Sequence, residues 1–341
     1  MGSWQDFVAV TIEAIWQPFA AFASPGTVIY WPYLVSAGFL AFAVPAIFTL
    51  TRGGGYMRTI REQFSRRVWW APSTRIDYLY YVVNAVLFPL IVAPAILTSF
   101  EVGEWLSNQL AALLGPRTEP AFDDASLRLA YTVIFFVAYD LGRFLAHWVQ
   151  HQNPFLWQFH KVHHSAEALT PMTSFRVHPV DLFVMAIGGN FFGGLVTGTF
   201  LYLGAGSVNI YTFLGLHIGI GIYSLIGNLR HSHVWLDYGP LSYVFVSPAQ
   251  HQIHHSTELR HRNKNCGFAF AFWDVLFGTL YVPKGRERFD MGLGDGTDGT
   301  WHAVHKLYWW PFAMAARVLT GRDPIAAGGQ KPAPGPDGIV R

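Results

Sequence analysis

The stretch LAYTVIFFVAYDLGRFLAHWVQHQNPFLWQFHKVHH, residues 129–164, joins an apolar run to two histidine motifs. The run from about 129 to 150 is long enough to cross roughly 30 Å of hydrocarbon as an α-helix. It ends at an HxxxH motif, and an HxxHH motif follows closely. Positions i, i+3 and i+4 of a helix share one face, so each motif presents its imidazoles to a common point. The stretch predicts a membrane helix that carries a histidine site at one end.

The composition of the whole chain also favours a membrane protein. Of its 341 residues, 52% are hydrophobic and only 13% are charged, whereas a soluble domain carries about 25% charged residues. The net charge of +2 is too small to favour a nucleic-acid partner. Because Cys266 is the single cysteine, a disulfide framework, a thiolate zinc site and a cysteine-bound iron–sulfur cluster are excluded.

Hydropathy predicts an all-α, polytopic fold. Residues 4–23 have the pattern of an amphipathic helix on the membrane surface. Apolar runs predict spans at 28–50, 78–98, 129–150, 181–202 and 209–227, whereas 268–282 and 302–319 are too short or too polar to span. Glycines at 188, 189, 193 and 194 suit close helix packing. We expect residues 1–323 to form one membrane-embedded domain and residues 324–341 to be disordered.

The charges of the loops predict on which side of the membrane each loop lies. An arginine-rich loop follows the first span, and the positive-inside rule assigns it to the cytoplasm. Its basic residues are Arg52, Arg58, Arg61, Arg66, Arg67 and Arg75. An acidic loop after the second span, with Glu101, Glu104, Glu119, Asp123 and Asp124, fits the outer face. This topology places the motif histidines on the cytoplasmic side.

Most of the 15 histidines lie between His147 and His261. They form an HxxxH motif, two HxxHH motifs and an HxH pair. The residues are His147 and His151; His160, His163 and His164; His251, His254 and His255; and His231 and His233. The two HxxHH motifs share the longer pattern HxxHHSxE, which indicates two similar half-sites and two metal ions. Imidazoles suit iron, copper, nickel or zinc, and among these zinc lacks redox chemistry.

Local signals place both HxxHH motifs on short helices. Asn153-Pro154 and Ser247-Pro248 have the pattern of an N-cap followed by proline at the first helical position. His231 and His233 point about 200° apart on a helix, so at most one of them shares the site unless the segment is irregular. We favour His231.

Other polar residues are open to two interpretations. Asp140 lies on nearly the same helical face as His147 and His151, so it either orients a ligand imidazole or pairs with Arg143. His178 is as well explained by a structural role as by the metal site, and Glu167 and Glu258 are weaker candidates for contact with the ligands. His217 is expected to hydrogen-bond the backbone. We expect the remaining three at the surface: His261, His302 and His305.

The order of these motifs resembles the fatty acid hydroxylase and sterol desaturase superfamily. The likeness runs over about 140–283. It includes Leu156-Trp157 before the second motif, Ser247-Pro248 before the third, the segment 231–241, and Asn265 through Trp273-Asp274 to Phe277-Gly278-Thr279. One departure is Trp148, where the family often has arginine, and it puts the contacts around the first motif in doubt.

The resemblance implies a di-iron centre in a cytosolic helical cap above four transmembrane helices. Such a centre would use O2 to hydroxylate, or alternatively to desaturate, a fatty acyl chain or sterol. By position, the implied ligands are His147, His151, His160, His163, His164, His231, His251, His254 and His255, with His233 and His178 as possible additions. We expect neither a cytochrome b5 module nor a nucleotide-binding loop in this chain, and therefore a separate ferredoxin- or cytochrome b5-type donor with its reductase. A bacterial inner membrane is the expected location.

Two other classes of protein fit the sequence less well. A membrane zinc hydrolase would normally carry an HExxH-type motif with a general-base glutamate, which the chain lacks. A metal transporter or haem-binding protein would distribute its ligands along the membrane interior. Only His217 fits that second pattern.

Overall fold

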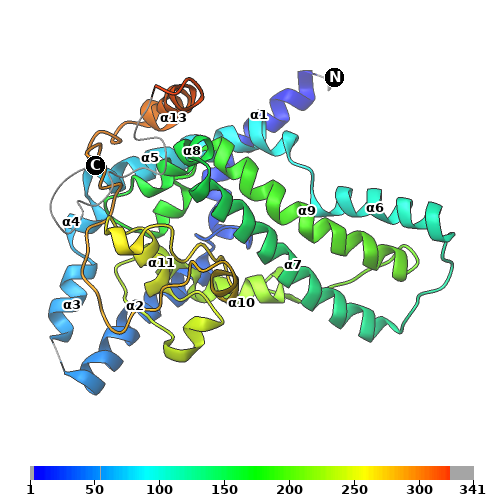
Figure 1. Cartoon of the computed structure of the whole chain (residues 1–341), viewed down its shortest axis with the longest axis horizontal. Helices are drawn as coiled ribbons and strands as arrows, with labels where there is room; N and C mark the ends of the chain where they lie inside the picture. Colours follow the sequence, from blue (N-terminus) through cyan, green and yellow to red (C-terminus); the bar gives the residue numbers. More distant parts are fainter. Residues whose placement is uncertain (1–3, 54, 323–341) are drawn as a thin grey trace.

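The computed structural model describes residues 4–53 and 55–322. It is mostly helical, as predicted (Figure 1). The helices are α1 Trp4–Ala20, α2 Trp31–Arg52, α3 Tyr56–Gln63, α4 Arg66–Trp69, α5 Pro72–Leu87, α6 Ser99–Leu114, α7 Asp124–Gln152, α8 Pro154–His164, α9 Pro179–Leu203, α10 Ile218–Gly227, α11 Pro248–His254, α12 Phe272–Leu276 and α13 Val304–Leu319. Short 3₁₀ turns are η1 Ala21–Ala23, η3 Ala93–Ala95, η4 Pro171–Phe175, η5 Asn228–His231, η6 Gly239–Tyr243 and η7 Leu259–His261, and η2 Phe88–Val92 is a π-helical turn. The predicted disordered tail lies outside the described residues.

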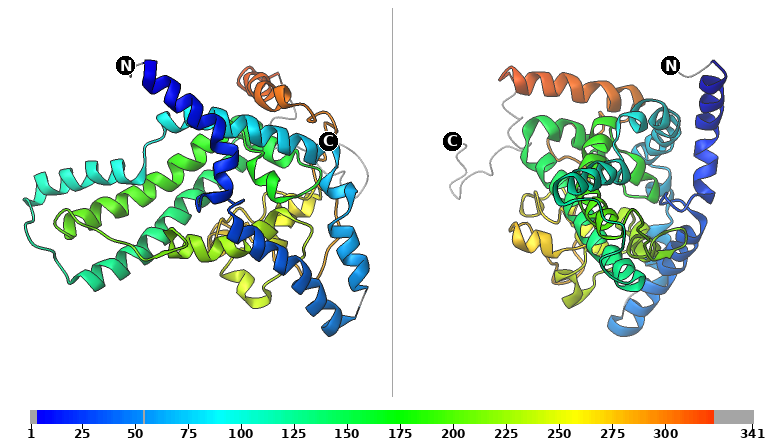
Figure 2. Two further views of the ribbon diagram at one scale, coloured as in Figure 1. Left: turned by 180° about the vertical axis from the view of Figure 1, so that it is seen from behind. Right: turned by 90° about the vertical axis from the view of Figure 1, so that its right-hand side faces the viewer.

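Helices α6, α7 and α9 extend side by side away from the rest of the molecule, with α9 packed on both of the others (Figures 1 and 2). Glycines allow this close approach, as the sequence predicts. A Cβ atom on Gly188 would lie 2.4 Å from the carbonyl oxygen of Gly142 on α7. A Cβ atom on Gly194 would lie 2.5 Å from the Cβ of Val102 on α6. Larger residues at these positions would force the helices apart.

Among the described residues, four helical stretches are long and apolar enough to cross a membrane, and the chain is an integral membrane protein. They are Trp31–Thr51, Pro72–Leu114, Asp124–Gln152 and Pro179–Leu203. The second is longer than predicted, because the expected acidic loop contains α6. Thr98 caps this helix, and its side chain accepts a hydrogen bond from the backbone of Glu101 at 3.2 Å. A strong N-cap thus starts a helix where charge alone indicated a loop.

The predicted fifth span at 209–227 is wrong. The segment forms strand β1 (Thr212–Phe213), which pairs antiparallel with β2 (Leu216–His217), and then the ten-residue helix α10. Leu214 and Gly215 adopt positive φ angles of 51° and 78° at the hairpin turn. A helix of ten residues is about 15 Å long, half of the hydrocarbon thickness. The segment is apolar although it is too short to span, and α10 packs against α2 and α7.

The remaining elements form a cap at one end of the bundle (Figure 2). Its core includes Tyr80, Val162, Trp301 and Leu307, which join α5, α8 and α13. The fully buried Arg176 donates to Asp77 at 2.9 Å and fixes α5 to the segment after α8. Helix α1 packs on α5, while Ile15, Trp16 and Phe19 are exposed. That α1 rests on the membrane surface remains a prediction.

Candidate metal centre

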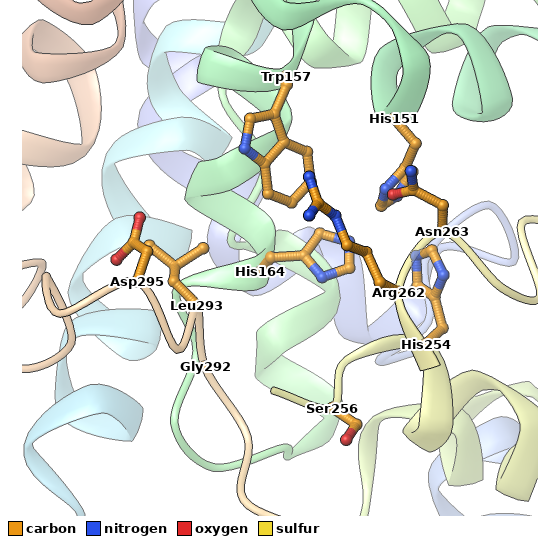
Figure 3. Close-up of a pocket in the computed structure, with 10 residues that line it drawn as sticks. All are labelled: His151, Trp157, His164, His254, Ser256, Arg262, Asn263, Gly292, Leu293 and Asp295. Atoms are coloured by element: carbon orange, nitrogen blue, oxygen red, sulfur yellow. The ribbon is translucent and has the colours of Figure 1, made fainter. Parts of the chain in front are cut away.

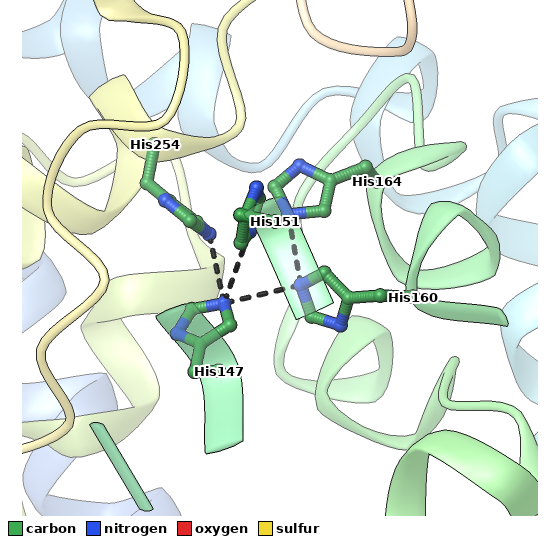
Figure 4. Close-up of side chains that lie close together, drawn as sticks. All are labelled: His147, His151, His160, His164 and His254. Atoms are coloured by element: carbon green, nitrogen blue, oxygen red, sulfur yellow. Dashed lines mark hydrogen bonds between the residues drawn. The ribbon is translucent and has the colours of Figure 1, made fainter. Parts of the chain in front are cut away.

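Within the described residues, the nine histidines that the sequence singles out gather in two buried groups. We define group A as the five residues His147, His151, His160, His164 and His254, and group B as the four residues His163, His231, His251 and His255. In each group one ring nitrogen from every histidine lies within 4.8 Å of the others. Figure 4 shows the side chains of group A pointing toward one another from three elements.

The two HxxHH motifs are shared between the groups in a reciprocal way. The first motif contributes its first and last histidines to group A and its middle one, His163, to group B. The second motif does the reverse, so that His254 alone joins group A. The HxxxH motif on α7 adds two histidines to group A, and His231 from η5 adds one to group B. Two adjacent sites therefore share the same two short helices.

The distances between ring nitrogens fit metal sites. In group A, Nε2 of His147 lies 3.1 Å from Nε2 of both His160 and His254. In group B, Nε2 of His231 lies 2.9 Å from that of His251 and 3.3 Å from that of His163. Imidazole nitrogens about 2.1 Å from a common ion would be roughly 3 Å apart. Both groups thus have the spacing that one ion each would require.

Helix caps hold the motifs in place as the sequence predicts. The Asn153 side chain accepts hydrogen bonds from the backbone of Phe155 and Leu156, and Pro154 begins α8. Ser247 forms a capping box with Gln250, and Pro248 begins α11. Both caps satisfy backbone N–H groups that a short, buried helix would otherwise leave without partners.

The outer ring nitrogens of group A are anchored by fixed acceptors. Nδ1 of His147 donates to the carbonyl oxygen of Cys266 at 2.7 Å, and Nδ1 of His254 donates to that of Lys264 at 2.7 Å. Nδ1 of His160 donates to the buried carboxylate of Asp181 at 2.9 Å. Since these contacts place the proton on Nδ1, they leave Nε2 free to bind a metal.

Group B has weaker anchors. Nδ1 of His231 lies 2.8 Å from the hydroxyl of Ser174, and Nδ1 of His163 donates to the carbonyl oxygen of Arg176 over 3.3 Å. Nδ1 of His251 and Nδ1 of His255 are buried with no hydrogen-bond partner in the described part of the chain. Two of its four imidazoles are therefore held by packing alone.

Burial keeps the histidines of the cap neutral. It lowers the pKa of His163 and of His254 to about 3. The pKa values of His164, His231, His251 and His255 also fall well below 6.5, chiefly through burial. At neutral pH these rings carry a free nitrogen lone pair, which is the form that binds a metal.

Asp140 makes neither of the two predicted contacts. Its carboxylate accepts hydrogen bonds from the backbone of Ala269 at 2.8 Å and of Phe270 at 3.1 Å, and from the indole of Trp273 at 3.0 Å. Arg143 instead stacks over the ring of Phe268. Asp140 thus fixes the loop that also presents the Cys266 carbonyl, and it reaches His147 only through that loop. Helical periodicity cannot foresee a partner more than a hundred residues away.

The other predicted histidines lie outside both groups. His178 caps α9 by accepting from the backbone of Val180 and contacts the carbonyl oxygen of Tyr308. His217 caps α10 and contacts the Thr132 carbonyl at 2.8 Å, which confirms its backbone role. His233 belongs to neither group.

Of the three histidines expected at the surface, one is exposed, one is half-buried and one is buried. His305 is exposed, and His302 is half-buried beside Glu167. His261 is buried and bound to Glu287, so its surface prediction is wrong. Glu167 and Glu258 are also not in contact with the centre, because Glu258 pairs with Arg260 and Glu167 accepts from the backbone of Gly299.

A small polar pocket opens onto group A. It has a volume of about 50 Å³, and His151, His164 and His254 form its floor (Figure 3). Arg262 and Asp295 line its walls, and the ring of Trp157 lies 5.2 Å from that of His151. The pocket gives small polar molecules a path to the group A imidazoles.

Sequence reasoning missed the residues that orient the ligands. Asp181 and Ser174 belong to no histidine motif, and the carbonyls of Lys264, Cys266 and Arg176 come from backbone that any residue supplies. Of these residues, only Asp181 could have been noticed in the sequence, because it is the single charged residue in the apolar helix α9.

Comparisons with known proteins find relatives of the histidine-bearing segment. Residues 132–279 match the fatty acid hydroxylase family model. The chain is 31% identical to an ornithine lipid hydroxylase of Rhizobium tropici over 48% of this chain and 46% of that protein. It is 25% identical to the alkylglycerol monooxygenase of Danio rerio (51% of this chain, 35% of the relative) and to a methylsterol monooxygenase of Aspergillus fumigatus (64% of each).

The matched region spans less than half of the length of the first two relatives. No solved structure shows a significant match to the chain. The family match covers all nine grouped histidines, and each of these relatives is a lipid hydroxylase or monooxygenase by name. The part of the chain that carries the two histidine groups is similar to the fatty acid hydroxylase family, in line with the superfamily that its motifs resemble.

Proposed function

We propose that this protein is a membrane-bound, non-haem di-iron oxygenase that hydroxylates an unactivated C–H bond of a membrane lipid. The observation that carries the proposal is the reciprocal sharing of two HxxHH motifs between two adjacent groups of imidazoles. Two ions held side by side are what a di-metal centre needs, and a set of nitrogen ligands suits iron.

The nine grouped histidines would hold the iron ions, five in group A and four in group B. Two iron ions bound there would supply the redox chemistry that O2-dependent oxidation of a C–H bond requires. The protein's own contribution is to hold the imidazoles neutral, fixed by Asp181, Ser174 and backbone carbonyls. Burial of every ligand also limits the access of bulk water to the reaction.

The relatives support a lipid substrate and favour hydroxylation. The names of three of them specify an ornithine lipid, an alkylglycerol and a methylsterol, and each of the three is called a hydroxylase or a monooxygenase. Another relative, from Gibberella zeae, is a sterol desaturase, so desaturation at the same centre is the second candidate. We further propose a bacterial inner membrane with the centre facing the cytoplasm, supported by the arginines that follow α2, and a separate ferredoxin- or cytochrome b5-type electron donor.

Lipid mass spectrometry under isotopically labelled O2 tests this proposal. Cells expressing the wild-type chain should accumulate a lipid that gains one labelled oxygen atom, and cells expressing His254→Ala should not. His305→Ala is the matched control, because His305 is exposed and lies outside both groups. Loss of two hydrogens without gain of oxygen would establish a desaturase instead. Identical lipids in wild type and His254→Ala, with zinc as the bound metal, would point to a hydrolase and contradict the proposal.

A further inference from the structure

A positively charged groove lies at the C-terminal end of α2. It has a volume of about 230 Å³ and is lined by Arg58, Arg286 and Arg288 together with Glu62. We call it the arginine groove. Arg58 pairs with Glu62 at 2.9 Å, while Arg286 and Arg288 form no ion pair within the described part of the chain. All three arginines are close enough to lower the pKa of Glu62. Three positive charges against one negative charge leave a net charge of +2 in the groove.

The wall of the arginine groove is apolar. Val44 and Phe48 of α2 and the ring of Trp235 face the same space as the arginines. A second cavity of about 230 Å³ beside it shares these three residues and Arg286. Charged and apolar surfaces therefore meet at the end of a helix that is apolar enough to span a membrane. This combination suits an amphiphile better than a soluble anion.

An apolar slot continues from the groove along α2. It has a volume of about 150 Å³, and its lining includes Ala37, Gly38 and Ala41 of α2 opposite Leu229. Gln63 lines both cavities and so connects them. Its side chain is 7% exposed, and its Oε1 atom has no hydrogen-bond partner in residues 4–53 and 55–322.

The inner wall of the slot is the segment that carries a group B histidine. Leu229, Ser232 and Val234 flank His231 in the sequence, and Ala37 and Ala41 pack directly on Leu229 and Val234. The opposite wall includes Pro171 of η4, the turn that also supplies Ser174 to His231. The slot therefore borders the segment that carries His231.

We propose that the arginine groove and the slot form one site for a membrane lipid with an anionic headgroup. The phosphate or carboxylate binds Arg58, Arg286 and Arg288, and an acyl chain lies along Ala37, Gly38 and Ala41 toward His231. Charge complementarity fixes the headgroup, and the exposed apolar helix α2 faces the bilayer that supplies the lipid. The binding of the lipid at this site is independent of the proposed function. The further step, that the bound lipid is the substrate, rests on the proposed function.

Native mass spectrometry of the purified full chain measures the binding of the headgroup. The probes are phosphatidylglycerol and phosphatidylcholine with identical acyl chains, and glycerol phosphate serves as the soluble anion. Wild type should prefer phosphatidylglycerol, and the triple variant Arg58→Gln, Arg286→Gln, Arg288→Gln should bind it roughly ten- to a hundredfold more weakly. Arg61→Gln is the matched control, because Arg61 is an exposed arginine of α3 that does not line the groove.

A substitution at Gly38 tests the slot separately. A Cβ atom on Gly38 would meet no described atom within 4 Å, so Gly38→Leu can fill the slot without disturbing the helix. It should weaken binding of both lipids about equally, whereas Gly38→Ala should bind as wild type does. The metal content of both variants should stay unchanged, which shows that the fold and the centre are intact.

The inference is overturned if the triple variant keeps the preference for phosphatidylglycerol, if glycerol phosphate competes as well as the lipid, or if Gly38→Leu binds normally. These readouts need no turnover. If wild type binds phosphatidylglycerol as described but oxidises no lipid, the proposed function fails and the lipid site stands. If turnover occurs and the variants bind normally, the lipid site alone is wrong.

Discussion

Group A and group B are built from the same HxxHH motif, yet their surroundings differ. Group A has five imidazoles, and a carboxylate and two backbone carbonyls fix three of them. Group B has four imidazoles, and one hydroxyl and one distant carbonyl fix two of them. Identical motifs therefore do not make equivalent sites, because the contacts that orient a ligand come from elsewhere in the fold.

The two groups also face different surroundings. Group A opens onto the polar pocket with Arg262 and Asp295, whereas the segment that carries His231 of group B borders the apolar slot along α2. With fewer and looser ligands, group B has more freedom to accept a further ligand beside the lipid. We infer that group A holds its ion tightly and that group B is the adaptable site.

The largest expected effect is the loss of a grouped histidine. His147→Ala and His251→Ala should both lower lipid oxidation to roughly one thousandth or less, because both ions are needed for the redox step. Their metal content should differ. His147→Ala leaves four ligands in group A and should retain nearly two ions, whereas His251→Ala leaves three in group B and should retain about one. Elemental analysis of the purified variants checks this, and equal losses would remove the distinction between the groups.

The second effect concerns the anchors of the imidazoles. Asp181→Asn should weaken metal binding at group A by about 10- to 100-fold, since a ligand histidine loses its charged partner. Ser174→Ala, the matched change at group B, should cost less, because a neutral hydroxyl is a weaker anchor. Timed release of iron to a chelator measures both. Faster iron release from Ser174→Ala than from Asp181→Asn would show that group B depends more on its anchor than group A does, contrary to this prediction.

The third effect acts through the loop at residues 266–273. Asp140→Asn keeps the shape of the side chain but weakens three hydrogen bonds to the loop, so the chain should lose about 1–3 kcal/mol of stability. Because the Cys266 carbonyl then moves, group A should also lose iron faster than wild type, but less than in Asp181→Asn. Thermal unfolding and chelator release together measure this. A destabilised variant with normal iron release would show that the loop does not position His147.

Features that depend on neighbouring residues could be predicted from the sequence. Spacing of i, i+3 and i+4 put the histidines on helix faces, and Asn153-Pro154 and Ser247-Pro248 marked where α8 and α11 begin. The reciprocal exchange of His163 and His254 between the groups was not foreseeable, because it depends on how two helices pack. The error at 209–227 has a similar origin, since an apolar β-hairpin followed by a short helix can have the same hydropathy as a span. Asp140 was misassigned because its partners lie on the distant loop at 266–273.

The smallest expected effect separates His231 from His233. On a helix, side chains two residues apart point about 200° away from each other, so both cannot face one point. The structure places His231 in group B and directs His233 into the apolar slot, where its Nε2 atom has no partner among the described residues. His231→Ala should therefore remove one ion per chain, whereas His233→Ala should leave both ions and change lipid oxidation by about twofold at most.

This last comparison tests group B most directly, because the two variants share a segment and a residue type. A general loosening of η5 would release iron from both, and only a specific ligand role for His231 separates them. If His233→Ala also lost an ion, the segment after α10 would have to rearrange on metal binding, and group B would have five ligands like group A. Iron content of the two variants, measured at equal protein concentration, decides between these possibilities.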